Sequence, residues 1–195
     1  MRKFEKLKPL LKKPLFHAWE AEQKGVHTSL LSYYTKKGLI ERLDRGIYRG
    51  KTAVLNVDFQ WEDLILIAKS IPKGAICLTS ALALYDLTEE IPRFHWIAIP
   101  NSSRAPKRKG VKIIRMRNFK LGKIKMKFGK ETITIFDKER TIVDSFRFLG
   151  RETAIKALKE SLKIKGQNKI NLRKIHRYSE KLRYNIDPYI LTATT

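Results

Sequence analysis

The stretch that decides the fold is GVHTSLLSYYTKKGLIERLDRGIYR, residues 25–49. Gly25 provides the tight bend that helix–turn–helix units often need between their two helices. A helix is expected to begin near Thr28, with Thr28 or Ser29 as its cap, and to end at Gly38. Two short strands follow, joined by an Asp-Arg-Gly turn whose glycine can adopt a positive φ. The pattern therefore predicts a helix–turn–helix that is followed by a β-wing.

The second helix of this motif has two chemically different faces. Leu31 and Tyr34 lie three residues apart and are expected to pack inward. Hydroxyls near the start of a recognition helix can reach base edges, and lysines near its end can reach phosphates. The predicted DNA-binding residues are Thr28, Ser29, Ser32, Tyr33, Lys36 and Lys37 on the helix and Arg42, Arg45 and Arg49 on the wing. A generic pair of helices with a solvated face is the alternative, and the unbroken order of these features favours DNA binding.

The charge of the chain points to a polyanionic partner. The 195 residues include 42 Lys and Arg against 19 Asp and Glu, which gives a formal net charge of +23. The excess occupies two regions on either side of a nearly neutral segment at 51–100. Residues 101–130 carry 12 basic groups and no acid. Such a density of like charge destabilises a compact state unless a counter-charge is bound. Nucleic acid is the first expected partner, and an anionic membrane surface is the second.

The periodicity of the remaining sequence predicts a mixed α+β fold. Helices are expected at 3–11, 18–24, 60–70, 81–85, 137–149, 152–164 and 171–183, and strands at 75–78, 93–99, 111–117 and 123–136. The expected organisation is a winged helix-turn-helix DNA-binding domain at 1–55 and a basic mixed α/β C-terminal domain at 56–195. A second basic surface is expected at Arg104, Lys107, Arg108, Lys109, Lys123, Lys125 and Lys127.

Catalytic and metal-binding patterns are missing from the sequence. The single Cys77 rules out a disulfide scaffold and a cysteine-based zinc site. Glu22-Gln23-Lys24 has the form of some nuclease motifs, but it lies in a predicted helix. Glu139 and Asp144, on the same predicted helix as Arg140, are expected to cap the helix or to form a neighbouring ion pair rather than to catalyse. We therefore expect no catalytic site, no metal and no cofactor.

Length and hydropathy indicate where the protein acts. The uninterrupted apolar runs are only a few residues long, which predicts no membrane-spanning helix and no membrane partner. The first residues carry no apolar segment of secretory type. The expected location is therefore the cytoplasm, in association with the nucleoid. No heptad pattern or long apolar seam indicates a stable dimer, so we expect monomers that bind paired half-sites cooperatively.

Three blocks of the sequence are similar to those of a known family. The blocks are KKGLIERLDRGIYR (36–49), CLTSALALYDLTEEIPRFHWIAIP (77–100) and FDKERTIVDSFRFLG (136–150). In this order they resemble the AbiEi antitoxins, which are the antitoxin and repressor halves of AbiE abortive-infection systems. The resemblance covers roughly residues 14–162. His17 departs from it, because a Ser or Thr cap is expected at that position.

The resemblance implies a type IV toxin–antitoxin system that acts in phage defence. The winged helix would bind inverted repeats in its own promoter and repress the operon. The C-terminal domain would neutralise a nucleotidyltransferase-like toxin without a stable complex. The charge pattern itself, apart from the resemblance, has two interpretations. Both domains touch the same DNA, or the Lys face binds RNA or the nucleotide substrate of the toxin. Three alternatives stay open: an RNA-binding protein that uses the Lys-rich hairpin, with Phe119 and Phe128 stacking on bases, a plain winged-helix regulator with no toxin partner, and a nuclease fused to a winged helix.

Overall fold

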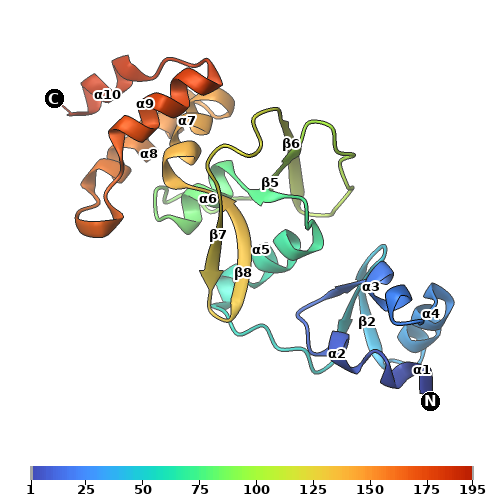
Figure 1. Cartoon of the computed structure of the whole chain (residues 1–195). Coiled ribbons are helices and arrows are strands. Elements are labelled where there is room, and N and C mark those ends of the chain that lie inside the picture. The colour runs from blue at the N-terminus through green and yellow to red at the C-terminus, as the bar shows by residue number, and fades with distance from the viewer. Residues whose placement is uncertain (1, 195) are drawn as a thin grey trace. The chain divides into compact units, whose positions relative to one another are not determined.

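The computed structural model describes residues 2–194, and contacts between residues divide the chain into two compact units (Figure 1). The first unit extends to Pro72 and includes Phe128–Glu131. The second contains Lys73–Lys127 and the chain from Thr132 onwards. Helices and sheets are mixed, so the predicted α+β class is confirmed. The predicted boundary between functional domains, at residue 55, stays a prediction.

Four short helices precede the first hairpin, and their arrangement is consistent with the predicted helix–turn–helix. They are α1 (Arg2–Glu5), α2 (Lys8–Leu11), α3 (Ala18–Gln23) and α4 (Thr28–Lys36). The prediction of one helix over 3–11 is wrong, because α1 and α2 are separate turns. Pro9 has no backbone N–H to donate to the carbonyl of Glu5, so a continuous helix cannot form there. Leu7 and Leu10 are nevertheless buried, as the spacing indicated.

A three-stranded sheet completes the N-terminal part of the first unit. Its strands are β1 (Phe16–His17), β2 (Ile40–Asp44) and β3 (Ile47–Gly50), in the order β1-β3-β2. The hairpin β2–β3 is confirmed, with Gly46 at φ +72° in the turn. Strand β1 pairs antiparallel with β3 through Phe16 and Tyr48, whose rings stack at a centroid distance of 5.8 Å. The sequence pattern did not indicate this third strand, because two residues are too few to show a period.

Helix α5 (Phe59–Ser70) belongs to the first unit together with the turn at Phe128–Glu131. The rings of Trp61 and Phe128 lie edge to face at 6.2 Å, and the Lys69 ammonium pairs with the Glu131 carboxylate. Helix α5 also contacts the N-terminal part of the unit, through Glu62 with Arg49 and through the Lys69 carbonyl with the His17 ring.

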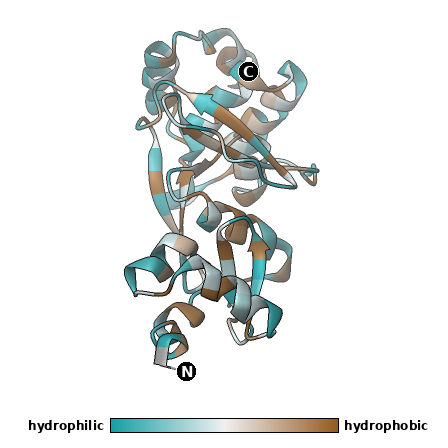
Figure 2. Ribbon diagram, turned by 90° about the vertical axis from the view of Figure 1, so that its right-hand side faces the viewer, coloured by the Kyte–Doolittle hydropathy of each residue, from teal (hydrophilic) through white to brown (hydrophobic). Residues whose placement is uncertain are grey.

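The second unit is built on a five-stranded mixed sheet in the order β6-β5-β4-β8-β7. Its strands are β4 (Ala75–Ile76), β5 (His95–Pro100), β6 (Val111–Met116), β7 (Lys123–Phe128) and β8 (Glu131–Phe136). Strand β5 runs parallel to β6 and antiparallel to β4, which is parallel to β8. Apolar residues concentrate in the inner strands, whereas β7 forms an edge (Figure 2).

Five α-helices accompany this sheet in the described part of the second unit. They are α6 (Leu78–Leu84), α7 (Lys138–Phe148), α8 (Arg151–Lys163), α9 (Leu172–Leu182) and α10 (Asp187–Thr194). Helix α7 packs against α6, α8 and α9, and Asp137 caps it as predicted by accepting the Arg140 N–H at 2.8 Å. Helix α10 was not predicted. No described helix has the length and the apolar character that crossing a membrane requires.

Candidate nucleic-acid interface

Helix α4 presents the two faces that its sequence predicted. Leu31 is fully buried and Tyr34 is 7% exposed, so the inward packing is confirmed. On the other side, Ser32 and Tyr33 are exposed, and Lys36 and Lys37 follow one turn later. Tyr33 is 52% exposed, with the Lys37 ammonium 5.9 Å from the centroid of its ring. Helix α4 contains no acidic residue, so its outer face offers hydroxyls and cations only.

The start of α4 differs from the prediction. Neither Thr28 nor Ser29 is the cap, because both are already inside the helix. The N-cap is His27, whose backbone is extended, and its Nδ1 accepts a hydrogen bond from the backbone N–H of Ser29 at 3.3 Å. The same ring nitrogen lies 3.0 Å from the Ser29 hydroxyl. The predicted contact of Ser29 with a base therefore competes with this internal hydrogen bond. Thr28 is half-buried.

The bend between α3 and α4 depends on Gly25. Its φ is +75°, in the left-handed region that residues with a Cβ disfavour. The N–H of Gly25 donates to the carbonyl of Glu22 at 2.8 Å, and the N–H of Val26 donates to the carbonyl of Ala21 at 2.9 Å. Val26 is then buried in the same core cluster as Leu31. The turn is thus closed by its own backbone bonds, which fixes the direction in which α4 leaves it.

The three arginines of the hairpin differ in their exposure and in their hydrogen bonds. Arg42 and Arg45 are exposed, and Arg45 lies in the turn, where its backbone N–H bonds to the Asp44 carboxylate. Arg49 is half-buried, because its guanidinium donates to the carbonyl of Ala53 at 2.9 Å and lies 3.4 Å from the carboxylate of Glu62. The fold therefore places Arg42 and Arg45 at the free end of the hairpin, whereas the Arg49 side chain is bound to other residues at its base.

The residues of the predicted second basic surface lie on two segments of the second unit, the loop between β5 and β6 and the strand β7. Strands β6 and β7 are the opposite edges of the sheet, so the structure does not bring the two groups to one edge. Arg104, Lys107 and Lys109 are exposed in the loop between β5 and β6, whereas Arg108 is half-buried. The ammonium-bearing side chains of Lys123, Lys125 and Lys127 are all exposed along the edge strand β7, as alternation predicted. An edge strand with a row of lysines also resists pairing with other strands, so a protective role is the simplest structural reason for the row.

The expectation that Phe119 stacks on bases is wrong. Phe119 is only 8% exposed and packs edge to face against Phe136, with the ring centroids 5.8 Å apart. Its ring is also covered by the Lys123 ammonium at 5.0 Å. Phe128 is half-buried and packs against Trp61. Burial therefore excludes base stacking by Phe119, whereas stacking by the half-buried Phe128 stays a prediction.

The Glu-Arg-Thr block of the sequence builds the interior of the second unit. Arg140 is fully buried, and its Nε lies 2.6 Å from Oδ2 of Asp144, whose Oδ1 lies 2.6 Å from Nη1 of Arg147. Glu139 accepts the backbone N–H of Asn171 at 3.1 Å instead of pairing with its neighbour. The expected pair of adjacent residues is wrong, because side chains three or four residues apart share a helix face.

Catalytic chemistry finds little support among residues 2–194. No group of three or more His, Cys, Asp or Glu in this range could hold a metal ion. Cys77 is buried, and desolvation raises the pKa of its thiol well above the usual value, which disfavours the nucleophilic thiolate.

The comparison with protein families identifies the N-terminal part of the chain. Residues 6–49 match the family model described as transcriptional regulator, AbiEi antitoxin. The matched range holds α2, α3, α4 and the hairpin up to Arg49, so the resemblance inferred from the sequence is confirmed there. No curated protein matches the chain.

Proposed function

We propose that this protein is the DNA-binding antitoxin of an AbiE-like type IV toxin–antitoxin system that acts in phage defence. Residues 1–55 form a winged helix that binds inverted repeats in the promoter of its own operon and represses transcription. One observation carries the proposal: the AbiEi match at 6–49 falls on a helix whose outer face has hydroxyls, lysines and no acid. The proposal assigns the chain no catalytic step, cofactor or metal.

The proposed docking places α4 in the major groove. Its first two turns then lie nearest the base edges, where the hydroxyls of Ser32 and Tyr33 can donate and accept hydrogen bonds. Lys36 and Lys37, near the end of the helix, reach phosphates of the backbone. Arg45 at the tip of the hairpin contacts the backbone beside the groove. Arg49 supports the hairpin from its base through Glu62.

Fluorescence anisotropy with two duplexes tests the docking. One duplex is the DNA upstream of the gene, and the other is a scrambled duplex of the same composition. Replacing Ser32 or Tyr33 with Ala should reduce the preference for the first duplex by about 1–3 kcal/mol, or roughly 5- to 150-fold, for each lost base contact. Lys36→Ala and Arg45→Ala should weaken both duplexes alike.

Two exposed residues outside the proposed interface provide matched controls. Thr52→Ala removes an exposed hydroxyl in the loop after the hairpin, and Lys159→Ala removes an exposed cation from α8. Neither should change the preference between the duplexes. Equal affinity for the two duplexes at moderate salt contradicts the proposal. An exchange of behaviour between the hydroxyl and the cation variants contradicts the placement of α4.

The C-terminal domain, residues 56–195, is proposed to neutralise a nucleotidyltransferase-like toxin without a stable complex. The toxin is expected from the neighbouring reading frame. Co-expression should restore growth to cells that make this toxin, and affinity purification of either protein should not retain the other. A stable complex, or a failure to restore growth, contradicts this part of the proposal. If growth is not restored, the remaining candidate is a plain winged-helix regulator with no toxin partner.

The free protein is proposed to be a monomer that binds paired half-sites cooperatively. Sedimentation of the free protein should give the mass of one chain, and the intact inverted repeat should bind two chains. Removing one half-site should weaken binding to the other. A stable dimer in the absence of DNA contradicts this proposal.

Binding of RNA is the second candidate function, favoured by the exposed row of Lys123, Lys125 and Lys127 on strand β7. Replacing the three lysines with Gln should then weaken binding to structured RNA more than binding to the promoter duplex. Both measurements are made at the same salt concentration, because electrostatic affinity depends steeply on it. An equal loss of affinity for the two nucleic acids would show that the three lysines attract nucleic acid non-specifically.

A further inference from the structure

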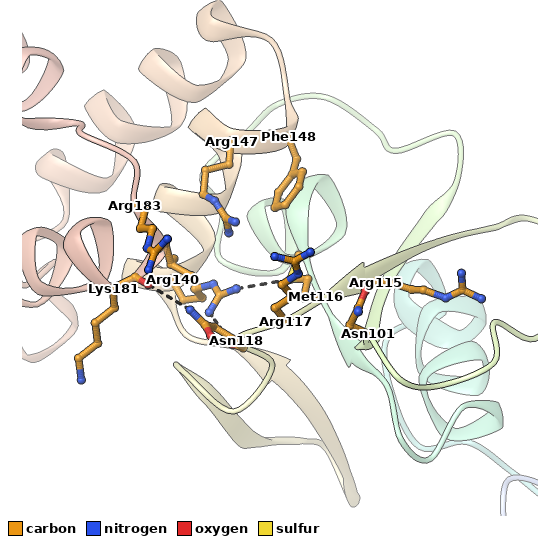
Figure 3. Close-up of a pocket in the computed structure, with 11 residues that line it drawn as sticks. Asn101, Arg115, Met116, Arg117, Asn118, Arg140, Arg147, Phe148, Lys181 and Arg183 are labelled. Carbon is orange, nitrogen blue, oxygen red and sulfur yellow. Dashed lines mark hydrogen bonds between the residues drawn. The ribbon is translucent and has the colours of Figure 1, made fainter.

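A strongly basic pocket of about 600 Å³ lies within the second unit. Its walls are the end of strand β6 with the turn that follows, Asn101 after β5, the first turn of α7 at Arg140, and the C-terminal ends of α7 and α9 (Figure 3). Six cationic residues line it, and no Asp or Glu does. They are Arg115, Arg117, Arg140, Arg147, Lys181 and Arg183. None of the six belongs to the DNA-binding surfaces predicted from the sequence.

The inner wall of the pocket is rigid because Arg140 is held on every side. Its Nε pairs with Asp144, and its Nη1 donates to the carbonyls of Asn118 and Leu121 at 3.0 and 3.2 Å. These bonds fix the turn that carries Arg117. The amide of Asn118 donates to the carbonyl of Lys181 at 3.0 Å, which ties the same turn to the end of α9. The backbone that carries Arg117 and Lys181 is therefore held in place before any ligand arrives.

The positive charge of the pocket is only partly balanced. Asp144 is shared by Arg140 and Arg147. Among residues 2–194, no ion pair involves any of the other four cations. Two helix C-termini add roughly half a negative charge each. Six cations against one carboxylate and these two ends leave about four positive charges unbalanced.

Arg117 and Arg183 are the two cations best placed to meet a ligand. Both are exposed, and Figure 3 shows Arg183 on the same side as Arg140, whereas Lys181 points away. Arg183 follows α9 with φ 53° and ψ 47°, a left-handed conformation that costs a non-glycine residue about 1–2 kcal/mol. The backbone thus holds an arginine at the pocket rim in a conformation that glycine or asparagine would adopt more readily.

We propose that this pocket binds a nucleotide through its phosphate groups, a function beyond the regulation of the operon. Arginine is the side chain best suited to phosphate, because its planar donors form paired hydrogen bonds. The volume is in the range of small-ligand sites. Phe148, 39% exposed on the lining and 4.7 Å from the Arg147 guanidinium, provides an aromatic surface for the base. The proposed ligand is a free nucleotide or the phosphorylated end of a single strand.

Calorimetric titration of the full-length chain tests the proposal. The probes are ATP, CTP, inorganic triphosphate and a 5′-phosphorylated tetranucleotide with its unphosphorylated twin. The variant combines Arg117→Gln with Arg183→Asn, because asparagine tolerates the left-handed backbone. The control, Arg173→Gln with Arg177→Gln, removes the same charge from exposed positions of α9 outside the pocket. The pocket variant should weaken binding by about tenfold or more for each arginine, and the control should change it little.

A third variant separates recognition of the base from recognition of phosphate. Phe148→Ala should weaken binding of ATP and CTP but leave inorganic triphosphate unchanged. Binding of the free nucleotides identifies them as the source, and binding of the phosphorylated strand alone identifies a strand end. Hydrogen exchange on the unmodified chain gives a second readout, since ligand should slow exchange in residues 117–122. Equal weakening by the control variant, or affinity that does not depend on the phosphate, overturns the proposal.

Discussion

Replacing Asp144 with Ala is expected to destabilise the second unit more than any other single charge removal in α7. The Asp144 side chain is 1% exposed and accepts from two guanidinium groups at 2.6 Å each. One of these groups, on Arg140, is fully buried. Without the carboxylate, the Arg140 charge stays inside the protein with only carbonyl and sulfur partners. Arginine cannot lose its proton to escape this cost.

The expected loss is about 3–5 kcal/mol, the range for a buried ion pair that loses one partner. With a urea dependence of about 2 kcal/mol per molar, the unfolding midpoint should fall by about 1.5–2.5 M. Arg147→Ala provides the control, because the Arg147 side chain is 24% exposed and its removal leaves the buried pair intact. We expect a loss of about 1 kcal/mol for that variant.

The assay must report on the second unit alone, since two units need not unfold together. Trp96 lies in strand β5, whereas Trp19 and Trp61 lie in the first unit. A background with both of these replaced by Phe therefore leaves a single fluorescent reporter in the sheet. A midpoint for Asp144→Ala that falls no further than that of Arg147→Ala refutes the reasoning.

Three further perturbations test other contacts. Gly122→Ala places a Cβ 2.6 Å from Cβ of Arg140 at a φ of +67°, whereas Gly110→Ala has a similar φ of +71° and open space. In urea unfolding, Gly110→Ala should lower the free energy of unfolding by about 1–2 kcal/mol, and Gly122→Ala should lower it by about 1–3 kcal/mol more. Equal losses for the two variants would contradict a steric clash at Gly122. The hydrogen bond with Asp187 raises the pKa of His176 above 6.5, so the contact between α9 and α10 is complete below that pH and weakens as the pH rises through the raised pKa. The protection of α10 against hydrogen exchange, relative to the intrinsic rate at each pH, should fall over this interval, but not in His176→Gln. Finally, Lys36→Ala should reduce the magnitude of the slope of log affinity against log salt concentration by about one on promoter DNA. An unchanged slope would contradict a contact between Lys36 and a phosphate.

Local signals in the sequence predicted those elements that depend on neighbouring residues. Gly25 and Gly46 adopt the positive φ values that their turns require, and Asp137 caps α7. Leu31 and Tyr34 pack inward because their spacing matches the helix period. In each case the residues that decide the conformation lie within one turn of the helix or hairpin, so no knowledge of the rest of the fold was needed.

Elements that depend on distant partners escaped prediction. Strand β1 has only two residues, and it exists because Tyr48 offers a partner for Phe16 across the sheet. One local feature was also predicted wrongly: the cap of α4 was assigned to a hydroxyl, whereas the ring of His27, two residues before Ser29, fills that role. Phe119 was expected to be available to bases, because a lysine-rich sequence does not show that this side chain packs against Phe136, which is 17 residues further along the chain.

By itself the sequence determined the two helices on either side of Gly25 with the hairpin that follows, the outer face of α4 and the acid-free block at 101–130. Helix and turn periods and net charge are properties of short segments, which is why they could be predicted. Only the tertiary structure decided which cations share a site. Arg117, Arg140 and Arg183 are far apart along the chain, and they line one pocket because the fold packs α7 and α9 beside strand β6. The physical reason is that a buried charge needs a partner, and the chain can supply Asp144 and the carbonyls of residues 118 and 121 only after it has folded.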